Sequence, residues 1–173
     1  ADDRLATAAG DLAVWLDGLG VDASGLLEDG LDPAVVATDL DRFRVAARRG
    51  LDRVEVDAAA AEADLVVAES THRGELHEGA APTAWLAAAR DDLAEQHLEV
   101  VLALVDLAER RGDHHQAVRL LLRVLERDAH DEGAHLRLVT CLEGTGRRGE
   151  ARRRYRTYVS RMQEIGVEPA PFP

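Results

Sequence analysis

Histidines and glutamates are the residues whose types and spacing first suggest metal chemistry in this sequence. Glu132 and His135 form one Glu-x-x-His pair, whereas a di-iron helix bundle needs two such pairs with further glutamates. His114 and His115 are adjacent, so they leave a helix in different directions. The other candidate ligands lie in a loop bounded by glycines: His72 and His77. We therefore expect surface and turn histidines, no metal site and no cofactor.

A second pattern, in residues 144–149, spells Gly-Thr-Gly-Arg-Arg-Gly and so matches G-x-G-x-x-G. In dinucleotide-binding folds this loop follows a strand, and its amides and a helix N-terminus hold the pyrophosphate. The preceding residues 136–142 are strand-like, but only 24 residues follow the loop, too few for further parallel strands. We favour a flexible turn between two helices and keep the dinucleotide site as the alternative.

Nucleophilic and acid–base chemistry has few candidates. Cys141 lies at an apolar position of its predicted helix, which is typical of a small core residue. No serine stands in a G-x-S-x-G elbow, and the carboxylates are spread along solvated helix faces. We therefore predict no catalytic residue and no enzymatic activity. A remote alternative is an enzyme with a metal site built from the histidines.

Arginines dominate residues 145–161, which hold seven arginines and a single glutamate. One interpretation is a solvated helix face that pairs with the acidic N-terminal half of the chain. The other is a docking surface for an acidic partner, either a protein or DNA beside a neighbouring domain's site. The predicted partner-binding residues are Arg147, Arg148, Arg152, Arg153 and Arg156.

Composition excludes several classes of protein. The 173 residues carry a net charge of −12, with 22 acidic residues against 8 arginines in residues 1–100. Such a chain repels phosphate backbones, so we expect poor binding to nucleic acid by this segment. One cysteine excludes an internal disulfide framework and fits a cytoplasmic protein. No apolar run approaches the length of a membrane span, so we expect no membrane contact.

The elements that carry these residues are predicted to be helices. Aromatic residues make up only 3% of the chain, and apolar residues recur at helical spacing in residues 97–111, 118–125 and 151–162. Earlier, Thr38 or Asp39 would cap a helix that Gly50 ends, and residues 57–70 would form its partner. Pro82 and Thr83 would open a further helix. The pattern predicts an all-α fold of six to seven helices.

An internal repeat organises the second half of the chain. The turn glycines Gly112 and Gly146, and the small residues Ala117 and Ala151, are each 34 residues apart. Asp113, with Gln116 three residues on, forms a predicted capping box after the first turn. The same 34-residue offset relates three further pairs: Leu104 and Leu138, Gln116 and Glu150, and Leu121 and Tyr155. This is the period of a tetratricopeptide array of helical hairpins, although its tryptophan, glycine and proline positions hold other residues.

Along its length the chain resembles a known family, the bacterial transcriptional activator domain of actinobacterial antibiotic regulatory proteins. The matching segments run in order through residues 38–43, 68–76, 85–93, 111–117, 125–128 and 166–169. They include Arg-Gly-Asp at residues 111–113 and the closing Gly-Val-Glu-Pro at residues 166–169. The resemblance covers residues 36–171 and implies a tetratricopeptide-like domain in residues 34–173.

In this family such domains usually follow a winged-helix domain that binds DNA. Residues 1–33 would be a degenerate remnant of it, because residues 5–19 contain no Arg, Lys, Asn or Gln to meet phosphates and bases. We expect DNA contact only through a separate domain, and the first residue, Ala1, suggests a piece of a longer protein.

The implied partners are RNA polymerase, another protein or a second copy of the chain. The implied function is a non-catalytic regulatory domain that couples a DNA-binding module to them. The alternative is a scaffold domain of a signalling or membrane-associated protein without a promoter role.

Overall fold

The computed structural model describes residues 38–74, 76 and 83–173, and their regular secondary structure is entirely α-helical. The helices are α2 (Asp39–Arg53), α3 (Ala58–Thr71), α4 (Ala84–Arg110), α5 (His114–Arg127), α6 (Glu132–Gly144) and α7 (Arg148–Glu164). This confirms the all-α fold class for the described residues. In that part of the chain, no helix combines the length and apolar character needed to cross a bilayer. The predicted winged-helix remnant in residues 1–33 lies outside the described residues.

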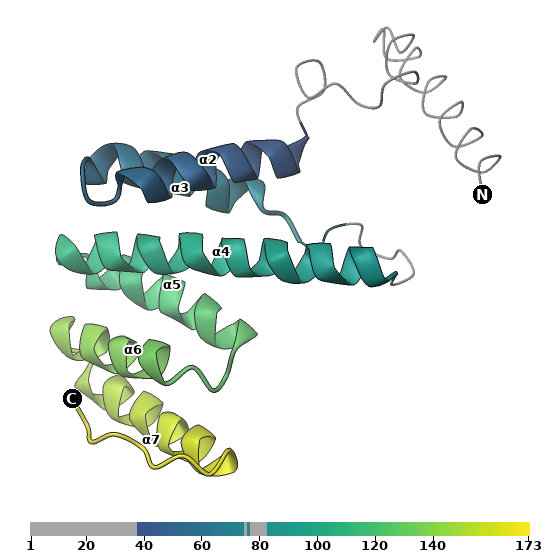
Figure 1. Cartoon of the computed structure of the whole chain (residues 1–173). Helices are drawn as coiled ribbons and strands as arrows, with labels where there is room; N and C mark the ends of the chain where they lie inside the picture. The colour runs from purple at the N-terminus through teal and green to yellow at the C-terminus, as the bar shows by residue number, and fades with distance from the viewer. Residues whose placement is uncertain (1–37, 75, 77–82) are drawn as a thin grey trace, which may run out of the picture. The chain divides into compact units, whose positions relative to one another are not determined.

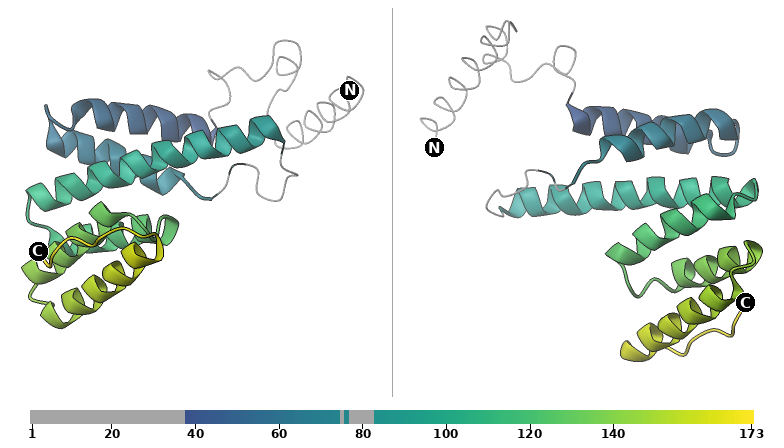
Figure 2. Two further views of the ribbon diagram at one scale, coloured as in Figure 1. Left: turned by 60° about the horizontal axis from the view of Figure 1, so that its bottom comes forward. Right: turned by 180° about the vertical axis from the view of Figure 1, so that it is seen from behind.

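Consecutive helices pack against one another within the unit formed by residues 42–173. Packing contacts join α3 to α4, α4 to α5, α5 to α6 and α6 to α7. Figures 1 and 2 show the helices stacked in the same order as they occur in the chain. They form the pairs α2 and α3, α4 and α5, and α6 and α7, and a short turn joins the two helices of each pair. The arrangement is the predicted tetratricopeptide-like array of helical hairpins.

The 34-residue repeat in the sequence is a repeat of two helix pairs in the structure. α6 ends 34 residues after α4, and α7 begins 34 residues after α5. Ala117 and Ala151, the predicted crossing residues, are both completely buried. A short side chain at the crossing lets the second helix of each pair approach the first closely. The apolar residues at the other repeated positions are buried or half-buried: Leu104, Leu121, Leu138 and Tyr155.

Each of these two pairs turns through a glycine in the left-handed conformation. Gly112 has φ +78° and Gly146 has φ +74°, a region that side chains with a Cβ rarely adopt. After each glycine, the next residue donates its N–H to the carbonyl five residues back, at 2.8 and 2.9 Å. Asp113 then caps α5 by accepting the N–H of Gln116 at 2.9 Å. The Gln116 side chain binds Arg111 instead of the cap's N–H, so half of the predicted capping box forms.

The predicted end of the first helix at Gly50 is wrong. α2 continues through Gly50 to Arg53, and the glycine is buried. A Cβ at this position would lie 2.6 Å from Cγ and 3.1 Å from the backbone nitrogen of Leu65. Gly50 therefore marks a close approach of α2 to α3 at Leu65, and the chain turns only after Arg53. Asp57 starts α3 by accepting the N–H of Ala60 at 3.0 Å.

Replacing Gly50 by alanine tests this crossing. The added methyl group would overlap the Leu65 side chain and crowd the Leu65 backbone nitrogen, so α2 and α3 would have to shift apart. We expect Gly50→Ala to lower the free energy of unfolding by about 1–3 kcal/mol, measured by urea denaturation. Gly149→Ala is the matched control, because a Cβ there meets only the Arg153 guanidinium at 3.8 Å. Wild-type stability in Gly50→Ala would contradict the close crossing.

Candidate partner-binding surface

The arginine-rich segment forms the last helix, α7, around a narrow buried stripe. Ala151, Tyr158 and Met162 face inwards and are at most 1% exposed. These residues recur at helical spacing, so the residues between them must lie on the other sides of the helix. Arg152, Arg153 and Arg156 are all exposed there. We call these three residues the arginine face.

Arginines at both ends of α7 are paired with glutamates of α6 and α7. Arg147 binds Glu150 at 2.6 Å, Arg148 lies 3.9 Å from Glu143, and Arg161 binds Glu164 at 2.9 Å. These three pairs use every acidic residue between positions 143 and 164. None of the three partners comes from the acidic N-terminal half, which is where the solvated-face interpretation placed them.

The arginine face has no ion pair to any residue that the structure describes. Thr157 and Ser160 continue this side of α7, and the Thr157 hydroxyl donates to the backbone oxygen of Arg153. A shallow hollow of about 510 Å³ lies here, lined by Arg153, Arg156, Thr157, Ser160, Arg161 and Glu164. Of the five predicted partner-binding residues, Arg147 and Arg148 thus form local ion pairs. The other three form no ion pair with a described residue.

The C-terminal tail (residues 166–173) packs beside a different side of α7. The Tyr155 hydroxyl donates to the carbonyl of Ala170 at 2.7 Å, and the Ala170 N–H donates to the Tyr158 hydroxyl at 2.7 Å. The Tyr158 hydroxyl in turn donates to Glu132 at the start of α6. Burial and the bond to Glu132 raise the pKa of Tyr158. Phe172 adds an edge contact to Tyr155, with ring centroids 5.1 Å apart.

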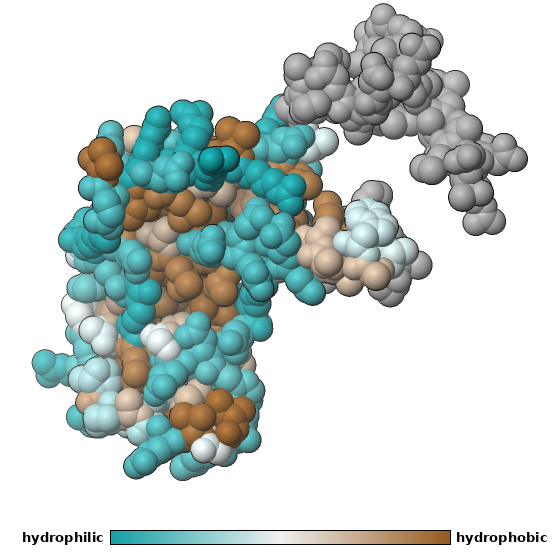
Figure 3. All heavy atoms as spheres, viewed as in Figure 1, coloured by the Kyte–Doolittle hydropathy of each residue, from teal (hydrophilic) through white to brown (hydrophobic). Residues whose placement is uncertain are grey.

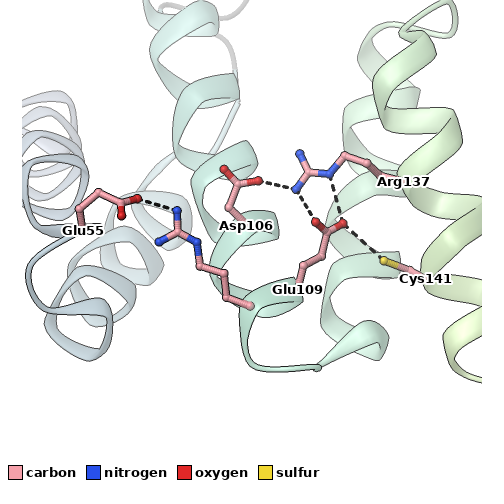
Figure 4. A network of polar contacts seen from close by, with 6 residues as sticks. Glu55, Asp106, Glu109, Arg137 and Cys141 are labelled. Atoms are coloured by element: carbon pink, nitrogen blue, oxygen red, sulfur yellow. Dashed lines mark hydrogen bonds and ion pairs between the residues drawn. The ribbon is translucent and has the colours of Figure 1, made fainter.

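Elsewhere in the described chain, several arginines join one helix to another. Arg137 of α6 binds Glu109 of α4 at 2.9 and 3.1 Å and also binds Asp106 (Figure 4). Arg110 of α4 binds Glu55, in the turn after α2, at 2.5 Å. Further pairs of this kind are Arg44 with Asp92, Arg53 with Asp64, Arg111 with Glu62, and Arg123 with Glu69. Sequence reasoning missed this network, because its partners are far apart in the chain.

The glycine-rich motif of residues 144–149 is a turn between helices. Residues 132–144 form α6, so the strand-like interpretation of residues 136–142 is wrong, and a helix stands where a dinucleotide fold has its strand. Gly146 supplies the left-handed turn. Gly144 packs closely against α5 of the preceding pair, since a Cβ there would lie 2.8 Å from the His114 ring. The structure therefore supports the turn and contradicts the dinucleotide alternative.

The expectation of surface histidines fails at His135. This side chain is only 5% exposed, packs against Tyr158 with centroids 5.7 Å apart, and binds the Ala129 carbonyl through Nε2 at 3.1 Å. His135 occupies the position where the repeat usually has a large residue, so it fills the core. Among the described residues, no group of three His, Cys, Asp or Glu is placed to hold a metal ion. His77 lies outside them.

His72 and His97 form a contact that sequence reasoning missed. Their rings stack with centroids 4.0 Å apart at 19°, where the end of α3 meets α4. Phe43 of α2 lies against both rings, at 5.7 and 6.3 Å. Burial, with smaller effects from His72 and Arg123, lowers the pKa of His97 to about 4. Both imidazoles therefore favour the neutral form, since burial also lowers the pKa of His72.

Cys141 is a core residue, as the sequence predicts. It is 1% exposed, and its thiol donates to Oε1 of Glu109 at 3.5 Å. Burial, and then the negative charge of Glu109, raise the pKa of the Cys141 thiol to about 12. Because the thiolate is the reactive form of cysteine, this environment opposes nucleophilic chemistry.

Thiol alkylation tests the environment of Cys141. In the folded protein at about pH 8, we expect iodoacetamide to label this cysteine at least about a hundredfold more slowly than in urea, because burial suppresses both access and thiolate formation. The measurement is mass spectrometry of labelled protein over time. Equal rates in the native and unfolded states would contradict the burial.

The histidine stack makes stability depend on pH. His97 has a pKa of about 4 when folded, against 6.5 ordinarily, so between these values the unfolded chain binds the additional proton. The free energy of unfolding therefore falls as pH decreases from about 6.5 towards about 4. Between about pH 7 and pH 5, we expect His97→Gln to lose less stability than wild type. With partial solvent screening, the difference is on the order of 1 kcal/mol. The exposed His115→Gln is the control, and an unchanged pH profile in His97→Gln would contradict the effect.

Comparison with curated proteins and with solved structures finds no match to this chain. A family model described as the bacterial transcriptional activator domain matches residues 38–172, which hold all six described helices and most of the C-terminal tail. This range agrees closely with the one expected from the sequence. The narrower kinship with actinobacterial antibiotic regulatory proteins stays a prediction. The chain belongs to the bacterial transcriptional activator domain family.

Proposed function

We propose that this domain is the non-catalytic contact module of a bacterial transcription regulator. It would couple a DNA-binding module, carried by another part of the protein, to the transcription machinery or to a partner protein. Its mechanism would be contact and orientation, and it would act in the cytoplasm, where a bacterial promoter lies. The single observation that carries this proposal is the family match over residues 38–172.

The architecture supports a role in contact. Helix pairs that contact only their neighbours offer extended outer surfaces, which helical-repeat proteins use for binding. Figure 3 shows apolar side chains exposed along the seams between α2, α4 and α6, with hydrophilic side chains on either side. The residues that could have carried out chemistry or bound a cofactor have structural roles instead. Cys141 and His135 are buried in the core, and Gly146 forms a turn.

Tethering the domain to DNA tests the coupling. The whole chain is fused to an unrelated DNA-binding domain, and its operator is placed upstream of a weak promoter. We expect the fusion to raise transcription above that of the DNA-binding domain alone, at equal operator occupancy. The measurement is reporter transcript level together with operator occupancy.

The matched control is the same fusion with Leu138→Asp. Leu138 is completely buried, so an unpaired carboxylate there should unfold the array and abolish the activation. Unaltered transcription with the wild-type fusion, at full operator occupancy, would contradict the coupling role. It would favour a scaffold domain without a role at promoters.

A further inference from the structure

We propose that the arginine face of α7 is a docking surface for an acidic α-helix of a partner protein. The partner helix would carry carboxylates one turn apart and would lie along α7 over Thr157 and Ser160. This inference rests on the proposed function, because it names the chemistry of the partner that the contact module would meet. It is carried by the pairing pattern, the spacing and the sign of the charges on the last helix.

The spacing of the arginine face fits a helix. Arg156 lies three residues after Arg153 and four after Arg152, so these side chains are neighbours on one side of α7, about one turn apart. Carboxylates at the same spacing on a partner helix would meet them in register. Each guanidinium offers a planar fork of donors that matches a carboxylate with two hydrogen bonds. The small side chains of Thr157 and Ser160 leave room for the partner to approach, at the shallow hollow described above.

The charges of this face are not neutralised by the chain itself in the part that the structure describes. The glutamates that flank the face are already bound, to Arg147, Arg148 and Arg161. The C-terminal tail lies against Tyr155 and Tyr158, so it does not cover the face. A partner with carboxylates would therefore meet these guanidinium groups without first breaking an ion pair to a described residue.

An exposed helix side needs polar residues for solubility, but solubility does not require one sign of charge. Between Ala151 and Gln163, α7 contains five arginines and no acidic residue. Like charges one turn apart destabilise a helix slightly, and alternating charges would provide the same solubility without that cost. The uniform sign is therefore locally unfavourable, and an acidic partner supplies a reason for it.

The charge balance favours a protein over nucleic acid as the occupant. The face offers three cations without an ion pair to any described residue, while the whole chain carries a net charge of −12. Non-specific binding to a duplex draws on several phosphate contacts, commonly about 6–10 for a DNA-binding protein, and the surrounding negative charge would repel the phosphates. An acidic helix needs only local complementarity over one or two turns.

Binding to a defined acidic helix tests the proposal. The probe is a labelled, alanine-based helical peptide of about 20 residues with glutamates one turn apart, and fluorescence anisotropy is measured with the whole chain. We expect saturable binding that weakens as salt rises, and no binding of the same peptide with glutamine at each glutamate position. Arg152→Glu/Arg153→Glu/Arg156→Glu should reduce the affinity at least about tenfold at low salt.

The matched control reverses three exposed arginines on other helices, in Arg42→Glu/Arg48→Glu/Arg119→Glu, and changes the net charge equally. Circular dichroism verifies that both variants fold. The proposal is overturned if the control loses as much affinity, if the glutamine peptide binds equally, or if duplex DNA binds the face more tightly than the acidic peptide. Failure here with intact tethered activation removes the docking surface alone. Peptide binding without tethered activation keeps the surface and removes the promoter role.

Discussion

Close approach of helix backbones at small residues is the constraint on which this array depends. Ala117 and Ala151 are completely buried at equivalent positions of the repeat, and Gly50 leaves no space for a Cβ beside Leu65. A larger residue at any of these positions would push two helices apart, and the separation would open voids around the neighbouring leucines. Since each helix pair buries its apolar side only against its neighbours, one widened crossing would disturb the next.

The features that the sequence predicts correctly are local ones. The helical spacing, the 34-residue repeat and the left-handed turns at Gly112 and Gly146 follow from residues close together in the chain. At Gly50 the local sequence predicts the wrong structure. A glycine after an apolar stripe commonly ends a helix, but here the size of Leu65 on the next helix requires it inside one. That reason lies on another element, so the pattern around Gly50 does not contain it.

The same limit applies to the candidate site. The sequence predicts an arginine-rich surface, but the division between paired and unpaired arginines depends on which carboxylates the fold brings near. Arg137 meets Glu109, 28 residues earlier, and so joins α4 to α6. The stacking of His72 on His97 and the buried place of His135 are likewise set by tertiary packing. From residue type alone, all of these side chains would be expected to be exposed.

Arginine therefore has two arrangements in the described part of this chain, paired across helix interfaces and unpaired on α7. Where two helices face each other, guanidinium groups such as that of Arg137 bind carboxylates across the seam and help to set the helix spacing. α7 packs against α6, and the C-terminal tail satisfies the tyrosines of α7 rather than its arginines. The bond of Tyr158 to Glu132 further ties α7 to α6. The backbone that carries the arginine face is thus firmly packed, so a partner of the proposed kind would have to order only the arginine side chains and not the helix.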